Sequence, residues 1–187
     1  MIRVNSNRIK RICQGDIFKN IEYIEYAIER KGICEISKIL FPLVIVLTQD
    51  CDLDQDFKSR KKTTKSINQD KYLLSVIVAP LYNIEHIYNG EHLSELKLKM
   101  HEIDKKSTHG KLLLQNQLPR YHYLEFKKDI PIVSSVIDFK HYFTVNLPYL
   151  LNIKETNFIC KVSTLYREDI SHRFASFLSR IGLPPSF

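Results

Sequence analysis

The sequence contains no tryptophan and, among 187 residues, only five glycines and seven prolines, so long low-complexity segments are not expected. It also has no apolar run long enough to cross a bilayer. The longest run, Ile39–Leu47, is interrupted by Pro42, whereas a membrane-spanning helix needs about 20 apolar residues. The basic N-terminal residues are not followed by the apolar stretch of a signal peptide. We therefore expect a soluble, cytoplasmic protein that does not bind membranes.

Several common cofactor and metal motifs are also missing. Without a CxxC pair, the scattered cysteines predict neither a zinc ribbon nor a disulfide framework. The chain has no GxGxxG or GxxxxGK[ST] phosphate loop and no GxSxG elbow. The seven histidines are dispersed and lack the HxxxH and HExxH spacings of a helix-borne zinc site. The sequence thus predicts no cofactor and no metal.

What the sequence does have is positive charge, with a formal net charge of +7 and a pI of about 9.2. This balance permits binding to RNA or DNA. The cations gather in a run without any apolar residue, which we expect to lie in a surface loop spanning about residues 54–71. The alternative is a solvated loop that only keeps the protein soluble. The candidate phosphate-binding residues are Lys58, Arg60, Lys61, Lys62 and Lys65.

Two short β-branched runs, Leu40–Thr48 and Tyr72–Pro80, predict buried strands. Residues 17–39 fit either a helix or two strands, because their isoleucines recur at helical spacing and also alternate. Lys31-Gly32 suits the turn of a hairpin, and we favour strands. Further strands are expected at residues 111–117, 121–126, 132–139, 142–147 and 158–163.

Two helices are expected, at about residues 92–106 and 165–181. The first would carry Leu93, Leu96, Met100 and Ile103 on one stripe. The second is the clearer, because its apolar residues follow helical spacing and Gly182 suits a C-terminal cap. That stripe consists of Ile170, Phe174, Phe177, Leu178 and Ile181.

Three segments of the first half carry a family resemblance: Gly15-Asp16-Ile17-Phe18, then Phe41–Leu47, then Val76–Leu81. In order and spacing they resemble the MazF/PemK-like toxins, small barrels of the SH3-like kind, over about residues 14–82. The resemblance implies an α+β fold with a small bent antiparallel β-barrel, extra strands and two covering helices. The whole chain, 1–187, would be a single domain with its barrel core at about 14–82 and 111–163.

The resemblance does not extend to the catalytic residues of that family. Its ribonucleases use an arginine before the first proline and a threonine or serine after the second, and those places hold Phe41 and Tyr82 here. The chain is also similar to a group of uncharacterised bacterial proteins through Thr48–Leu53 and Tyr166–Pro184. That second resemblance implies no activity.

The strongest candidate site is the polar block that follows the strand ending at Thr48. Cys51 is a candidate nucleophile with Asp52 beside it and His122 as the candidate base, while Asp16, Gln49 and Arg120 would support the site. Neighbouring carboxylates, however, raise a thiol pKa and disfavour the thiolate. The structural alternative has Asp52 turned inward to accept hydrogen bonds from Arg120, with Cys51 shielded.

The alternating acidic residues that begin at Asp50 also leave open a single Mg²⁺ bound by two carboxylates. An EF-hand is excluded, because its glycine and glutamate positions hold Gln55 and Lys61.

Three functions follow from these features. The first is a nucleic-acid-binding accessory protein of a toxin–antitoxin or phage-defence system, a context implied by resemblance alone. The second is a Cys- or Asp-dependent hydrolase or nuclease centred on Gln49–Asp52. The third is an interaction module that uses the C-terminal helix to bind a protein encoded nearby or a second copy of the chain.

Overall fold

The computed structural model describes residues 2–5, 10–61 and 69–180. Its strands are β1 (Val4–Asn5), β2 (Asp16–Arg30), β3 (Ile33–Val46), β4 (Ser75–Asn83), β5 (Tyr121–Leu124), β6 (Ser135–Asp138), β7 (Phe143–Asn146) and β8 (Phe158–Val162). Its helices are α1 (Asp50–Arg60), α2 (Ile84–Tyr88), α3 (Thr108–Leu114), α4 (Leu147–Asn157) and α5 (Thr164–Leu178), with 3₁₀ turns η1 (Ser94–Leu96) and η2 (Phe139–His141). Across these described ranges, no helix combines the length and apolar character that crossing a membrane requires.

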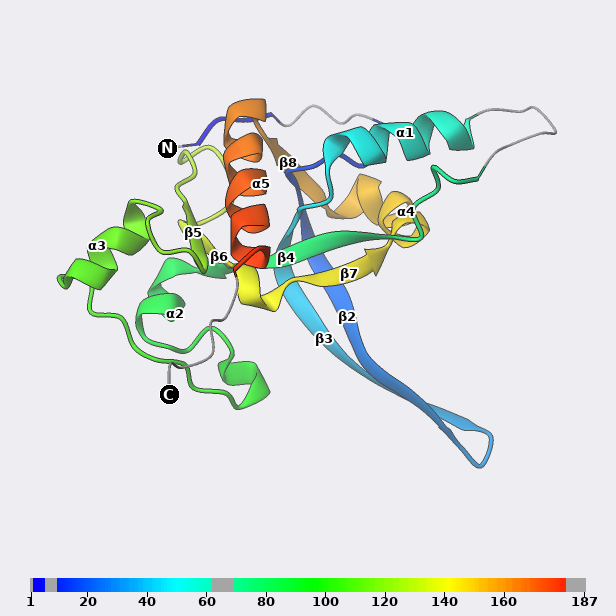
Figure 1. Cartoon of the computed structure of the whole chain (residues 1–187). Helices are drawn as coiled ribbons and strands as arrows, with labels where there is room; N and C mark the ends of the chain where they lie inside the picture. Colours follow the sequence, from blue (N-terminus) through cyan, green and yellow to red (C-terminus); the bar gives the residue numbers. More distant parts are fainter. Residues whose placement is uncertain (1, 6–9, 62–68, 181–187) are drawn as a thin grey trace, which may run out of the picture.

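The strands form one curled antiparallel sheet, shaped like half a barrel, in the order β1-β8-β2-β3-β4-β6-β5, with β7 also paired to β4 (Figure 1). This confirms the expected α+β class and the bent antiparallel sheet. Both faces of the sheet centre are covered. α5 packs on one face and α1 and α4 on the other, which explains why the inner end of β3 and most of β4 are apolar on both faces.

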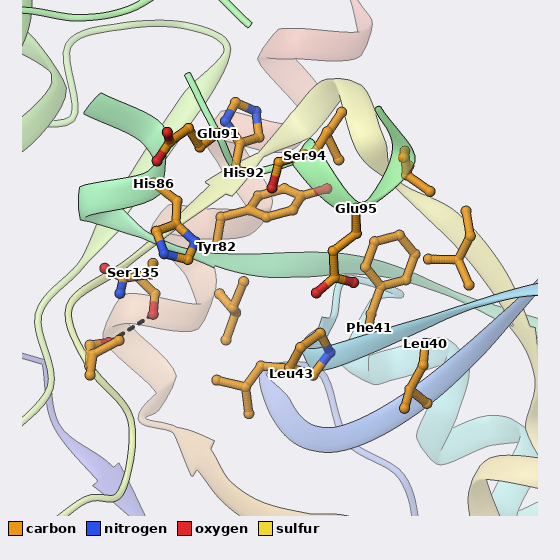
Figure 2. Close-up of a pocket in the computed structure, with 17 residues that line it drawn as sticks. Leu40, Phe41, Leu43, Tyr82, His86, Glu91, His92, Ser94, Glu95 and Ser135 are labelled. Atoms are coloured by element: carbon orange, nitrogen blue, oxygen red, sulfur yellow. Dashed lines mark hydrogen bonds between the residues drawn. The ribbon is translucent and has the colours of Figure 1, made fainter. Parts of the chain in front are cut away.

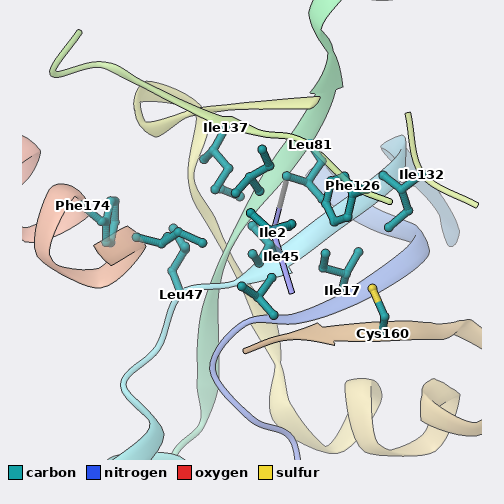
Figure 3. Close-up of a cluster of buried hydrophobic side chains, with 14 of the residues drawn as sticks. Ile2, Ile17, Ile45, Leu47, Leu81, Phe126, Ile132, Ile137, Cys160 and Phe174 are labelled. Carbon is teal, nitrogen blue, oxygen red and sulfur yellow. The ribbon is translucent and has the colours of Figure 1, made fainter. Parts of the chain in front are cut away.

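Strand alternation divides the hairpin root between two cores. Ile17 and Ile45 lie in the core on the α5 side, together with Phe174 of that helix (Figure 3). Phe18 and Val44 point the other way, into the core that contains Leu150 of α4. Because successive residues point to opposite faces of the sheet, these two strands contribute side chains to both cores.

The expected hairpin over residues 17–39 is confirmed and is longer than predicted. β2 and β3 are joined by Lys31 and Gly32, which both adopt positive φ, 52° and 76°, as the two central residues of a tight hairpin turn do. The root of this hairpin lies in the sheet, but its outer half extends away from the body (Figure 1).

Two predicted elements are wrong. The surface loop expected over residues 54–71 begins as helix α1, and residues 62–68 of that loop lie outside the described residues. The helix expected over 92–106 contains only the short turn η1. Its apolar residues still pack into a core, as those of a helix would. The backbone is not helical, because the N–H groups of Met100 and Ile103 donate to the carbonyls of Gly90 and Tyr88.

The strand predicted at 111–117 is also wrong, because that segment lies largely in α3, whose first turn is capped by Ser107 through a bond from the Gly110 N–H. Helix α4 was not predicted at all. The C-terminal helix is confirmed, with Ile170 and Phe174 buried and Leu178 exposed. Because its stripe packs against the sheet, most of it is not free for a partner, and Gly182 lies outside the described residues.

Candidate functional site

Three distinctive segments of the sequence meet at the carboxylate of Asp50. Arg11 donates to both of its oxygens, Nη1 to Oδ1 at 3.0 Å and Nη2 to Oδ2 at 2.8 Å. The backbone N–H of Gln14 donates to Oδ1 at 3.1 Å, and Arg167 of α5 lies 3.2 Å from Oδ2. The segment before β2, the start of α1 and the start of α5 are thereby tied together.

This Asp50 network (Arg11, Gln14, Asp50, Arg167) surrounds the carboxylate with donors, while the buried Nε of Arg167 has no hydrogen-bond partner among the described residues. Burial raises the pKa of Asp50, but the hydrogen bonds and charge of Arg11 outweigh it and lower that pKa to about 2. Asp16 lies nearby as a fully buried carboxylate, which accepts from the Cys13 N–H and from Nζ of Lys154 at 2.9 and 3.1 Å. Burial raises the pKa of Asp16, and Lys154 opposes that shift. Removing one partner from such a network is destabilising, because it leaves a charge without its counter-charge.

The predicted inward position of Asp52 is wrong, and so is the predicted shielding of Cys51. Both side chains are exposed on the first turn of α1. Because a helix starts at Asp50, its period turns Asp50 and Leu53 towards the body and leaves the two residues between them in solvent. The Cys51 thiol contacts only its neighbours Gln49 and Asp52 at hydrogen-bonding distance among the described residues.

The structure does not bring His122 or Arg120 to this site. They lie on or next to β5, on the far side of the molecule from α1 (Figure 1). His122 is buried, and burial together with the charge of Arg173 lowers its pKa to about 3. Arg120 pairs with Asp138 instead of Asp52. A Cys51–His122 nucleophile and base are therefore not assembled.

The basic residues of α1 are largely engaged within the helix. Lys58 pairs with Asp54, and Arg60 pairs with Asp56 and donates to the backbone oxygen of Leu73. Lys61 stacks over the ring of Phe57. Lys62 and Lys65 lie outside the described residues.

A groove that the sequence did not predict lies where β3 and β4 face residues 91–100. It consists of two adjoining hollows of about 310 and 320 Å³, both lined by Phe41, Tyr82, Leu93 and Leu96. Figure 2 shows the first of them. Its walls are mainly apolar, while His86 and Glu91 lie at one end. Phe41 and Tyr82 are the two positions at which the family resemblance placed catalytic residues.

A polar cluster lies under this groove. Asp138 is fully buried and accepts from Arg120 at 2.8 and 2.5 Å. His141 Nδ1 lies 3.4 Å from Asp138 Oδ2 and 3.2 Å from the Tyr82 hydroxyl. His92 Nε2 lies 3.9 Å from Asp138 Oδ2. Burial lowers the pKa values of both histidines, that of His92 to about 4, so both rings are neutral at pH 7. We call His92, Asp138 and His141 the Asp138 cluster.

The second unusual surface is the outer part of the β2–β3 hairpin, residues 22–40, which we call the arm. Cross-strand pairs share a face, so the register assigns its side chains to two faces. One face carries Tyr23, Tyr26, Ile28, Ile33 and Ile39, interspersed with Arg30, Glu35 and Ser37, and runs directly into the groove, whose lining includes Tyr23 and Ile39. The opposite face carries Ile24, Ala27, Cys34, Ile36 and Leu40, interspersed with Glu22, Lys38 and Glu29.

No protein-family model and no curated protein matches this chain. In the described structure, the candidate functional features are the arm, the groove and the Asp138 cluster. Of these, the arm is the feature whose exposed chemistry is hardest to explain in an isolated molecule, because a two-stranded ribbon alone is at best marginally stable in water.

Proposed function

We propose that this protein is a self-associating binding protein, and that the arm of one copy docks on the body of a second copy. The observation that carries the proposal is the exposure of large apolar side chains along the arm, with Tyr26 at 52% and Ile33 at 68%. Contiguous apolar surface of this kind marks interaction sites. Arm docking replaces the C-terminal helix as the proposed contact surface.

One face of the arm continues into the groove, which supports a protein surface, rather than a small molecule, as what binds there. The arm face that carries Tyr26 and Ile33 continues through Tyr23 to Phe143 and then to Phe41. The ring centroids of Tyr23 and Phe143, and those of Phe143 and Phe41, are 5.2 Å apart. An arm from a second copy would extend along this strip while its own strip receives the first arm. Such a reciprocal contact closes on itself as a twofold dimer.

The charge distribution supports a second copy in particular. The arm contains four glutamates, at 22, 25, 29 and 35, and three cations, at 30, 31 and 38, and so has a net charge of −1. Because the whole chain carries +7, the remainder carries +8. A slightly acidic arm and a basic body attract one another between copies, and complementary charge steers association and suppresses wrong partners.

Sedimentation of the purified chain tests this proposal. We expect the wild type to sediment as a dimer at micromolar concentration and the double variant Tyr26→Ser/Ile33→Ser to sediment as a monomer with an unchanged circular dichroism spectrum. The matched control is Ile24→Ser/Ile36→Ser, which removes two side chains, each 58% exposed, from the opposite face of the same arm. The control should remain a dimer. A monomeric wild type, or equal behaviour of the two double variants, contradicts the proposal.

Nucleic-acid binding by a degenerate MazF-like barrel is a second proposal, and one observation favours it. Lys58 is 71% exposed beside Lys61 at the end of α1, where the chain enters the Lys62–Lys65 segment. We expect Lys58→Gln/Lys61→Gln/Lys65→Gln to weaken RNA or DNA binding and flatten its salt dependence. Arg60 is kept because it pairs with the buried Asp56. An unchanged affinity and salt slope would exclude this surface.

A further inference from the structure

The Asp138 cluster combines three potential metal ligands from separate parts of the chain. His92 comes from the loop after α2, Asp138 from the end of β6 and His141 from η2. One ligand atom from each of the three lies within 4.8 Å of the others. Two imidazoles and a carboxylate are the donor set of many catalytic zinc and non-haem iron sites.

The spacing of these atoms is close to that of a coordination shell. Ligand bonds of about 2.1 Å in a tetrahedral arrangement separate neighbouring donor atoms by about 3.4 Å. His141 Nδ1 is 3.4 Å from Asp138 Oδ2, and His92 Nε2 is 3.9 Å from it. The third separation, between the ligand atoms of His92 and His141, is at most 4.8 Å, so the His92 ring would have to move towards the other two ligands to complete three sides of the shell.

An independent observation is that His92 lacks the partners a buried ring requires. Its side chain is 1% exposed and lies near the backbone of His86, yet among the residues that the structure describes neither ring nitrogen has a partner at good hydrogen-bond geometry. Buried polar atoms are nearly always paired, and an unpaired one points to strain, a functional role or a bound ion. Here the orphaned Nε2 lies beside a buried carboxylate.

We propose that His92, Asp138 and His141 bind one divalent transition-metal ion, with Zn²⁺ as the ion that this donor set suits best. The histidines supply neutral lone pairs and Asp138 supplies the negative charge.

The surroundings of Asp138 support this role. Arg120 donates to both oxygens of the carboxylate and the Lys140 N–H donates to Oδ1, which fixes the plane of the carboxylate. Oδ2, which accepts from Arg120, is also the oxygen that both histidines face. Outer hydrogen bonds of this kind orient metal-binding carboxylates. The Tyr82 hydroxyl, 3.2 Å from His141 Nδ1, lies where it can become a fourth ligand or contact a metal-bound water. Since Tyr82 lines both hollows of the groove, a molecule in the groove would reach the ion from that side.

Metal binding to the chelator-treated full-length protein tests the proposal. We expect competition with a chromophoric chelator to give one Zn²⁺ per chain. His92→Gln and His141→Gln should each weaken the affinity at least tenfold. The matched control is His122→Gln, which alters another buried histidine with an unpartnered Nδ1 outside the cluster and should bind like the wild type.

Two further measurements keep the test decisive. The exposed thiols of Cys34 and Cys51 are alternative ligands, so Cys34→Ser/Cys51→Ser must retain the site. If the histidine variants do not fold, the absorption spectrum of the Co²⁺-loaded wild type decides, because thiolate ligands add an intense near-ultraviolet band that imidazole and carboxylate do not. No binding, loss of the site in the cysteine variant, or equal affinities of His92→Gln and His122→Gln would overturn the proposal. None of these outcomes depends on whether the arm forms a dimer.

Discussion

The two carboxylate clusters of this protein look alike at the carboxylate and differ in the side chains around it. Asp50 accepts from Arg11 and Gln14 and lies beside Arg167. Asp138 accepts from Arg120 and the Lys140 N–H, so its carboxylate is paired as fully as that of Asp50. The difference is that two histidines face Asp138, and neither nitrogen of His92 has a partner at good hydrogen-bond geometry within the described structure. The Asp50 network therefore joins elements through ion pairs, whereas the Asp138 cluster brings imidazole nitrogens to its carboxylate.

The surroundings of the two clusters differ in the same direction. The Asp50 network joins α1, α5 and the segment before β2, and it lies where the sequence predicted the functional site. The Asp138 cluster lies under an open groove whose lining includes its two histidines, His92 and His141. Polar residues beside a core strand thus did not distinguish the Asp50 network from the Asp138 cluster, where we propose a metal site. What distinguishes the Asp138 cluster is its position beside the groove.

The largest effect should come from removing the central carboxylate of the first cluster. Asp50→Ala leaves Arg11 and Arg167 without their shared partner, and we expect it to lower the free energy of unfolding by about 3 kcal/mol. Asp52→Ala is the matched control, because Asp52 lies two residues further along the same helical turn and is exposed. It should lower the free energy of unfolding by about 0.5 kcal/mol, through loss of its interaction with the helix dipole. Urea denaturation of both variants measures the difference. Equal losses would show that the Asp50 network does not stabilise the fold.

A smaller effect should appear as a pH dependence of the same pairing. The pKa of Asp50 is lowered from 3.8 to about 2 in the folded protein, so its contribution is complete above about pH 5 and is lost progressively as the pH falls towards about 1. This shift corresponds to about 2 kcal/mol. The gap in unfolding free energy between wild type and Asp50→Asn should therefore shrink over that range. A gap that stays constant from pH 5 to pH 2 would disprove the assignment.

The smallest effect concerns Cys51, which is adjacent to Asp50 in sequence but outside its network. Cys51 and Cys34 are exposed, while Cys13 and Cys160 are buried, and burial raises the pKa of Cys160 to about 12. We expect two of the four thiols to react quickly with a thiol reagent at pH 7, and the other two only after unfolding. Cys51→Ala should change stability by less than about 0.5 kcal/mol. Fewer than two fast thiols in the native protein would contradict the exposed position of Cys51.

Much of the fold could be predicted where local signals agreed with tertiary packing. The turn chemistry of Lys31-Gly32 located the hairpin, and the spacing of Ile170 and Phe174 located α5. The apolar stripe beginning at Leu93 failed as a helix signal, because those residues reach their core from an open chain held by backbone bonds to Gly90 and Tyr88. Periodicity reports which side chains are buried and does not fix the backbone that buries them.

The candidate site was predictable only in part. The polar block at Thr48–Asp52 could be recognised from the sequence, but not the helix phase, a matter of two residues, that turns Asp50 rather than Asp52 inward. The Asp138 cluster left no signal in the sequence, because His92 lies more than 40 residues from its partners. His141 and Asp138 are only three apart, but without the ring of His92 that spacing is commonplace. Only the pairing of β6 with β4 brings these segments under one groove.

In the proposed dimer each arm is covered by a second copy, so the arm also affects how the protein behaves before it pairs. A ribbon with alternating isoleucines and tyrosines, whose outer edges have no neighbouring strand within the described structure, offers a template for strand addition by other unfolded chains. In newly made copies, the proposed dimerisation would therefore compete with precipitation. Solubility should fall most steeply when synthesis outpaces pairing, and Tyr26→Ser/Ile33→Ser should raise the soluble yield even as it abolishes the dimer.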